Sequence, residues 1–159
     1  MPANARTPDI DDDFEPLPGH YIRRMQQIAV AIFLQETEAF GLTPVQFAAL
    51  QAVSRKPGID QRTLAATIGL DTSTTGGVVD RLEGRGLLRR NPSETVRRVR
   101  LLTPTPEGEA LLAQIRPAML RAQDRMLEPL PPAERAEFMR MLAVLVHANN
   151  ELSRAPSGS

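Results

Sequence analysis

The chain has 159 residues, a length typical of one domain of ordinary size with an extension. It contains no cysteine, which excludes disulfides, thiolate metal sites and thiol redox sensors. It has no apolar run long enough to span a bilayer, and its acidic N-terminus lacks the apolar segment of a secretory signal. We therefore expect a cytoplasmic protein with no membrane partner, no metal and no cofactor.

The formal net charge is zero, but the charges are segregated along the chain. Residues 9–15 hold five acids and no base, whereas residues 81–100 hold seven arginines against Glu83 and Glu94. Such a local basic stretch is the electrostatic footprint of nucleic-acid binding even when the total cancels. A solvated arginine-rich surface is the alternative.

The N-terminal part divides into a tail and a helix. Residues 1–16 are polar and acidic, so we expect a disordered acidic tail. Leu17–Gly19 is a turn signal, after which apolar residues recur at three- and four-residue steps until Gly41. We assign residues 17–41 to an N-terminal helix.

Residues 42–104 carry the start and stop signals of three short helices and a hairpin. Starts are marked by Thr43 with Gln46 as a capping box, by Asp60, and by one of Asp71, Thr72 and Ser73. Stops are marked by Lys56-Pro57-Gly58, Gly69 and Gly84 to Gly86. A strand at Leu87–Arg90, a turn at 91–94 and a return strand at Val96–Leu102 follow. This order predicts a winged helix-turn-helix, in a fold that is mostly α with a small β-wing.

Residues 105–153 read as further helices. A long helix starts at Thr103–Gly108, and Pro117 inside it is expected to kink or divide it. Prolines 129, 131 and 132 precede a last helix, and residues 154–159 form a tail. Since the central module is large enough to close its own core, the apolar faces of the flanking helices predict a homodimer. The dimer would set two recognition helices about 34–36 Å apart on a palindromic operator. Packing on their own module, as a monomer, is the alternative.

The helix that begins near residue 72 has the chemistry of a recognition helix. Thr72, Ser73, Thr74 and Thr75 offer four hydroxyls beside a helix N-terminus, whose free N–H groups suit phosphate. Gly76 and Gly77 cost helix stability, which predicts either close approach of DNA or packing by a neighbouring helix.

Four arginines complete the predicted DNA-binding set. Arg81 faces either a phosphate or its acidic neighbours Asp80 and Glu83. Arg97, Arg98 and Arg100 lie in or beside the hairpin, where arginine enters the minor groove.

An ordered set of motifs resembles the MarR family of bacterial transcription regulators over about residues 18–153. The motifs are Leu42-Thr43-Pro44-Val45-Gln46-Phe47, Pro57-Gly58, Leu64-Ala65, Asp80-Arg81-Leu82-Glu83, Arg85-Gly86-Leu87 and Thr105-Pro106-Glu107-Gly108. The resemblance implies a homodimer that binds double-stranded DNA and represses nearby genes. In many members a small aromatic carboxylate or phenolic effector releases the protein from the DNA.

The chain departs from this family in its wing and recognition helix. Val96 stands where the wing usually has Asp, with Glu94 as a possible replacement, and Pro104 stands where Leu is usual. Gly76 replaces a common Thr and Gly77 a common Arg. The absence of cysteine excludes the peroxide-sensing type of member.

Candidate effector residues lie at the starts of two helices. His20, Tyr21 and Arg24 open the first helix and Phe47 lies in the second, a combination that suits an aromatic carboxylate. An exposed His20 and a core-filling Tyr21 are the alternatives, and His147 is expected to be structural.

An enzyme is not expected. The two histidines lie 127 residues apart, and the chain has no P-loop, nucleophile elbow or HExxH motif. A winged-helix module that contacts proteins remains the alternative to DNA binding.

Overall fold

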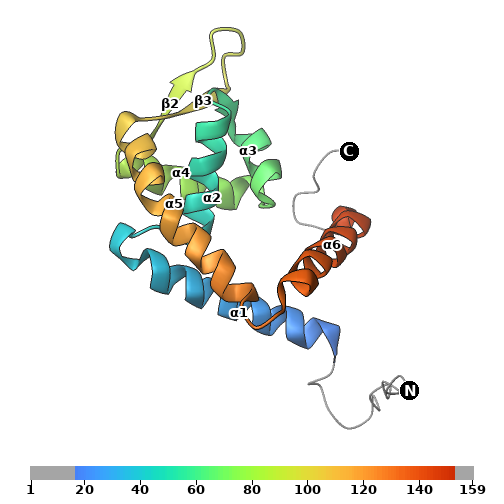
Figure 1. Ribbon diagram of the computed structural model, residues 1–159. Helices are drawn as coiled ribbons and strands as arrows, with labels where there is room; N and C mark the ends of the chain where they lie inside the picture. The colour runs from blue at the N-terminus through green and yellow to red at the C-terminus, as the bar shows by residue number, and fades with distance from the viewer. Residues whose placement is uncertain (1–16, 153–159) are drawn as a thin grey trace, which may run out of the picture.

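The computed structural model describes residues 17–152, which form six α-helices, two short 3-10 helices and one small sheet (Figure 1). The mostly α fold with a β-wing is therefore confirmed. The predicted tails at 1–16 and 154–159 lie outside the described residues.

The central module contains three helices and three strands. The helices are α2 (Pro44–Arg55), α3 (Gln61–Ile68) and α4 (Thr72–Gly84), and the strands are β1 (Ile59–Asp60), β2 (Leu88–Pro92) and β3 (Arg100–Pro104). The sheet has the antiparallel order β1-β3-β2, with Ile59 opposite Leu102 and Leu88 opposite Pro104. α3 and α4 form the helix-turn-helix, and the β2–β3 hairpin projects beyond the helices as the wing (Figure 1).

Side-chain caps start the three helices, as the sequence predicts. The Thr43 hydroxyl accepts from the Gln46 N–H at 3.1 Å, and the Gln46 side chain accepts from the Thr43 N–H at 3.2 Å. Among the three candidates for α4, Asp71 is the cap, accepting from the Thr74 N–H at 2.7 Å. Asp60 holds the corresponding capping position at the start of α3. The hydrogen bond that its carboxyl accepts from the Thr63 backbone N–H holds the pKa of Asp60 below its usual value.

The hairpin differs from the prediction in the bounds of its two strands. β2 extends to Pro92, and β3 begins at Arg100 instead of Val96. Residues 96–99 form a turn, because the Ser93 hydroxyl accepts from the N–H of Val96 and the Val99 N–H donates to the Val96 carbonyl at 3.1 Å. These groups serve the local turn and not a strand ladder. β1 was not predicted, since two residues carry no periodicity.

One aliphatic core holds the module together. Leu50, Val53, Leu64, Val79, Leu82 and Leu102 are fully buried, and Ile115 joins them from α5. Large-to-small changes at such sites cost about 2–5 kcal/mol of stability. The module is therefore a rigid platform for the face of α4 that it leaves exposed.

The flanking helices are α1 (Pro18–Thr37), continued by the 3-10 helix η1 (Glu38–Phe40), then α5 (Pro106–Leu127), α6 (Pro132–Ala148) and the 3-10 helix η2 (Asn150–Leu152). α5 runs past Pro117 without a break. Of the two expected effects of Pro117, a kink or a division, the division was wrong, because the buried neighbours Ile115, Ala118 and Ala122 pack the helix on both sides of the proline.

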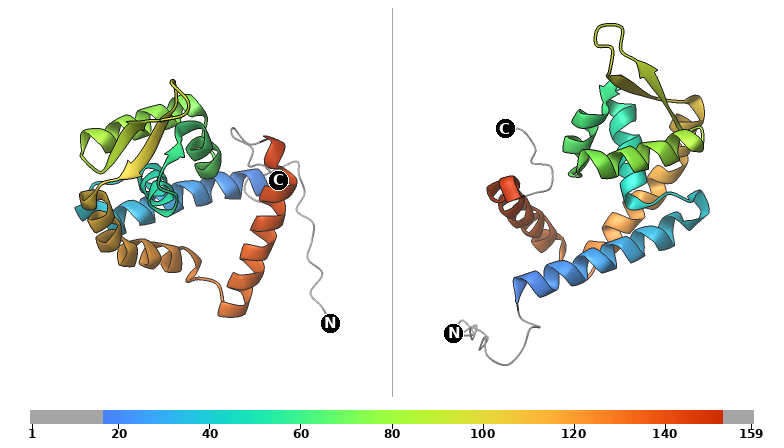
Figure 2. Two further views of the ribbon diagram at one scale, coloured as in Figure 1. Left: turned by 90° about the horizontal axis from the view of Figure 1, so that it is seen from above. Right: turned by 180° about the vertical axis from the view of Figure 1, so that it is seen from behind.

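α1 and α5 lie side by side, whereas α6 stands away from the module (Figure 2). Among the described residues, α6 contributes no buried side chain. No single helix in residues 17–152 is long and apolar enough to cross a membrane. α1 with η1 and α2 pass that test only together, across a 68° bend, and their buried apolar residues belong to the core.

Candidate nucleic-acid interface

The inner face of α4 packs into the module. Thr75, Val79 and Leu82 recur at helical spacing and are buried. The Thr75 hydroxyl donates to the Asp71 carbonyl at 2.8 Å and lies among core side chains. Thr75 was expected among the DNA-contacting hydroxyls, but its place in the core leaves it no path to a ligand.

The outer face of α4 is open. Ser73, Gly77 and Arg81 recur every four residues and are exposed. A Cβ at Gly77 would meet no atom within 4 Å, so a partner can approach the backbone closely there. Thr72 and Thr74 are exposed beside this face, and the Thr74 hydroxyl also donates to the Asp71 carboxylate at 2.7 Å.

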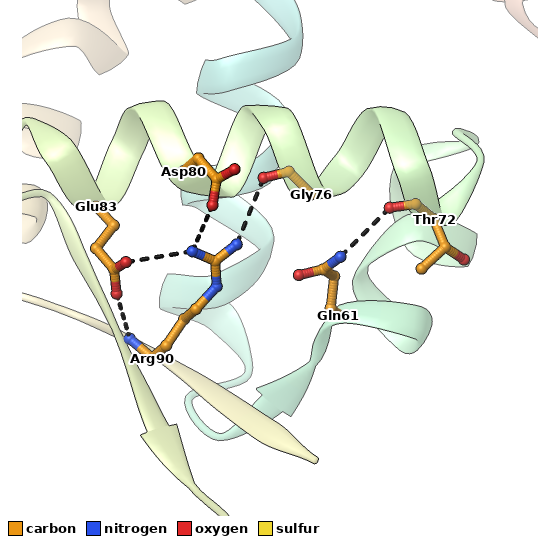
Figure 3. Close-up of polar contacts among 6 residues, drawn as sticks. All are labelled: Gln61, Thr72, Gly76, Asp80, Glu83 and Arg90. Carbon is orange, nitrogen blue, oxygen red and sulfur yellow. Dashed lines mark hydrogen bonds and ion pairs between the residues drawn. The ribbon is translucent and has the colours of Figure 1, made fainter. Parts of the chain in front are cut away.

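Arg81 makes no ion pair in the part of the chain that the structure describes. The acidic neighbours considered as its partners, Asp80 and Glu83, bind Arg90 of β2 (Figure 3). Arg85 donates to the carbonyls of Gly41 and Phe40, so it anchors the loop before α2. Arg81 is thus the cation that α4 presents outward.

Gly76 lies between the buried and the open face of α4, on the side that contacts Gln61 of α3 and Arg90 of β2. A Cβ there would lie 3.0 Å from Gln61 Nε2, and that side chain donates to the Thr72 carbonyl at 3.3 Å (Figure 3). Of the two explanations for the glycine pair, packing by a neighbouring helix fits Gly76. Open approach fits Gly77.

The wing carries three exposed cations. Arg97 and Arg98 lie in the turn and Arg100 opens β3, all of them exposed. Glu94, considered as a replacement for the missing wing acid, forms no ion pair with them within residues 17–152. The Ser93 hydroxyl closes the tip instead. The open face of α4 and the wing therefore present exposed hydroxyls, together with arginines that form no ion pair within residues 17–152.

The predicted effector residues do not meet within one chain. Phe47 is buried, with its ring 5.8 Å from that of Phe33 near the end of α1. His20 lies thirteen residues before Phe33, roughly 20 Å along a helix that rises 1.5 Å per residue. His20 contacts Arg23 at 3.3 Å, and Tyr21 is 56% exposed. Tyr21 lines an apolar groove with Met126 of α5 and Phe138 of α6.

Phe47 instead lines a cavity of about 250 Å³ between α2 and α5. Its polar walls come from Gln51, Ser54, Arg55, Glu109 and Arg116, and its apolar walls from Leu112 and Ala113. The Ser54 hydroxyl lies 2.9 Å from both Glu109 carboxylate oxygens and joins the two helices. Sequence reasoning missed Arg55 and Arg116, although Glu109, Leu112 and Arg116 share one helical face by spacing.

Comparison with known proteins identifies the family. The sequence model of the MarR family matches residues 40–99. A putative transcriptional regulatory protein for the hcr operon of Thauera aromatica is 34% identical over 134 residues, which cover 84% of this chain and 81% of the relative. The chain belongs to the MarR family.

Solved structures of MarR-type regulators have the same fold. BpsR of Bordetella bronchiseptica, whose DNA binding is regulated by 6-hydroxynicotinic acid, is 32% identical with a TM-score of 0.80, covering 84% of this chain and 95% of that one. The repressor CouR, bound to a 23-mer DNA duplex, is 33% identical with a TM-score of 0.78 and coverages of 83% and 94%. PcaV of Streptomyces coelicolor, in complex with its natural ligand, is 33% identical with a TM-score of 0.77 and coverages of 86% and 96%. These MarR-family relatives are transcription regulators, and some of them respond to ligands.

Proposed function

We propose that this MarR-family protein is a homodimeric repressor that binds a palindromic operator and leaves it when a small aromatic carboxylate or phenol binds. The observation that carries the proposal is the open surface formed by the outer face of α4 and the wing, whose arginines form no ion pair within residues 17–152. Its members are Thr72, Ser73, Thr74, Gly77, Arg81, Arg97, Arg98 and Arg100.

This surface suits duplex DNA in shape and charge. An α-helix fits the major groove with its N-terminal residues near base edges, where Ser73 and Thr72 lie. Gly77 has no side chain to hold the helix away from the groove, and Arg81 is one turn further along. The wing arginines suit the neighbouring backbone or minor groove.

The homodimer is supported by apolar surface outside the module. α6 exposes Met139, Met141, Val144, Leu145 and Val146, each about half exposed or more. α1 exposes Tyr21 and Ile22 beside the apolar groove against α6. Monomers rarely leave so much contiguous apolar surface in water. A second copy would cover it around a two-fold axis.

The cavity between α2 and α5 supports the effector. Arg55 and Arg116 suit a carboxylate, and Phe47 and Leu112 suit a ring. A ligand there would separate Ser54 from Glu109 and so shift the DNA-binding module against α5. His20, Tyr21 and Arg24 lie too far along α1 to reach this cavity in one chain, so they remain candidates for a contribution from a second copy.

DNA binding is tested by a gel shift against a salt series. We expect the logarithm of the operator affinity to fall linearly with the logarithm of salt, with a slope of about −0.9 per phosphate contact. The Arg98→Ala variant should bind more weakly, with a shallower slope and an unchanged far-UV circular dichroism spectrum. Wild-type affinity in that variant would refute the wing assignment. A wild type that binds no duplex at low salt would favour the protein-contact alternative.

The effector is tested with 6-hydroxynicotinic acid and 4-hydroxybenzoic acid as probes. We expect one of them to weaken operator binding by the wild type at least tenfold, the effect of about 1.4 kcal/mol of coupling between the two sites. The Arg116→Ala variant should keep its operator affinity but lose this response, because its cavity lacks a carboxylate partner. An exposed arginine of α3, changed in Arg62→Ala, is the control. An unchanged response in Arg116→Ala would move the site elsewhere.

A further inference from the structure

We propose that Arg90 is a positioning residue that fixes the angle between the recognition helix α4 and the wing. The inference rests on the proposed DNA binding, since the angle matters for an operator read by both elements. We call the contacts of Arg90 with Gly76, Asp80 and Glu83 the strap.

The strap joins β2 to α4 at four points (Figure 3). The Arg90 guanidinium lies 2.6 Å from the Asp80 carboxylate and 3.2 Å from that of Glu83, and it donates to the Gly76 carbonyl at 3.4 Å. The Arg90 backbone N–H also donates to Glu83, at 3.1 Å. One arginine therefore binds the helix through both its side chain and its main chain.

The two ends of the strap are held by different parts of the module. Arg90 lies opposite the fully buried Leu102 of β3, so the sheet fixes its backbone. Gly76, Asp80 and Glu83 lie on one stripe of α4, which spans about 10 Å at 1.5 Å per residue. Rotation or sliding of α4 against the wing must therefore break at least one of these contacts.

Gln61 holds the same helix from the side of α3. It donates to the Thr72 carbonyl at 3.3 Å and lies within 3.0 Å of the place that a Cβ at residue 76 would take. Gly76 thus leaves room for the Gln61 side chain while its own carbonyl accepts from Arg90. α4 is held between α3 and β2 along its middle, with its outer face free.

The strap is expected to act on geometry more than on stability. Its acids are both exposed to solvent, with 67% of the Asp80 side chain and 42% of the Glu83 side chain accessible. Exposed ion pairs contribute little to stability. Reading base edges depends on placement, whereas non-specific phosphate binding tolerates small rotations. Breaking the strap should therefore reduce specificity while leaving the fold intact.

Asp80→Asn gives the sharpest test, because a pure charge effect and a positioning role predict opposite changes in DNA affinity. Removing an acid from a DNA-binding helix strengthens binding if only charge matters. If the strap positions α4, the variant instead loses about tenfold in affinity for a duplex selected by the wild type from a random library, a loss comparable with one misread base pair. Binding to a scrambled duplex should stay the same or improve. The control is Glu94→Gln, which removes an acid from the wing outside the strap.

Arg90→Gln should show the same loss of specific affinity with an unchanged salt slope, because Arg90 is engaged by acids and makes no phosphate contact. The neighbouring exposed Arg89 supplies the control Arg89→Gln. Arg90→Lys should not rescue binding, because one ammonium cannot bridge the three acceptors. Tighter specific binding by Asp80→Asn, or selected-to-scrambled ratios equal to wild type in both strap variants, would overturn the proposal.

A second measurement needs no DNA and separates this proposal from the proposed function. The chain has no native cysteine, so spin labels can be attached at Ser73→Cys on α4 and Glu94→Cys on the wing. With excess unlabelled chain to dilute partner spins, the distance distribution should be narrow in the otherwise wild-type chain. It should broaden or shift with Arg90→Gln and not with Arg89→Gln. An unchanged distribution in Arg90→Gln would overturn the strap, whatever the DNA result. A wild type that selects no duplex would contradict the proposed function but not the contacts of the strap.

Discussion

Gly108 lies in the first turn of α5, where the helix passes over the backbone of Leu87. A Cβ at this position would lie 2.0 Å from the Leu87 carbonyl oxygen and 3.4 Å from Leu50 Cδ1. The Thr105 hydroxyl donates to the Gly86 carbonyl at 2.6 Å and accepts from the Gly108 N–H at 3.0 Å. The glycine therefore allows α5 to close onto the wing base, which accounts for its place in the Thr105–Gly108 motif.

We predict that Gly108→Ala destabilises the protein by about 3 kcal/mol, the cost of forcing a methyl group into a filled site. Gly77→Ala is the matched control. Its Cβ would meet nothing within 4 Å, so it should gain up to about 1 kcal/mol from helix propensity. Urea denaturation of both variants checks the sign. Equal stabilities of Gly108→Ala and wild type would show that α5 is free to move away from Leu87.

At the scale of elements, α1 and α5 are joined by an ion-pair cluster. Glu36 of α1 accepts from Arg125 at 2.9 Å and from Arg121 at 3.2 Å, both on α5. Hydrogen bonds from Arg125 and then Arg121 lower the pKa of the Glu36 carboxyl from its ordinary value of 4.5. The cluster therefore joins the C-terminal half of α5 to α1.

We predict a pH-dependent contribution of Glu36 to stability. Because its pKa is lowered in the folded state, this contribution is complete above about pH 4.5, the ordinary value, and is lost as the pH falls through the folded-state pKa. Glu36→Gln should therefore unfold more easily than wild type at pH 7. The difference should shrink progressively below pH 4.5. Thermal unfolding between pH 3 and pH 7 measures this, with Glu38→Gln at an exposed neighbour as control. A difference that stays constant with pH would contradict the prediction.

At the scale of the whole molecule, the placement of α6 bears on the proposed dimer. The helix stands away from the module (Figure 2). Several of its apolar side chains are exposed in a single chain. α1 and the end of α5 contribute the other walls of the adjoining groove. A two-fold dimer through these surfaces would hold two α4 helices at a fixed spacing.

We predict that Met141→Glu combined with Leu145→Glu converts the proposed dimer into a monomer of 17.5 kDa. The two residues lie four apart on one face of α6, so the new charges would be buried together without partners in a dimer. Operator affinity should fall when dimerisation is lost, whereas the circular dichroism spectrum of the helices should stay unchanged. Sedimentation at micromolar concentration measures the mass. Exchanging the exposed pair Glu137 and Arg140 is the control, and a wild type that sediments as a monomer would contradict the dimer.

The sequence by itself determined the helix starts, the glycine stops and the order of elements, and hence the winged helix-turn-helix. These features depend on chemistry within a few residues: Thr43 with Gln46, Asp60 with Thr63, and Asp71 with Thr74. Only the tertiary structure decided which face of α4 is free. Thr75 is buried in the core, and Gly76 contacts Gln61 and Arg90. Ser73, Gly77 and Arg81 remain exposed. The tertiary structure also decided that α5 continues past Pro117. The free face of α4 and the continuity of α5 both depend on packing between residues that are distant in the chain.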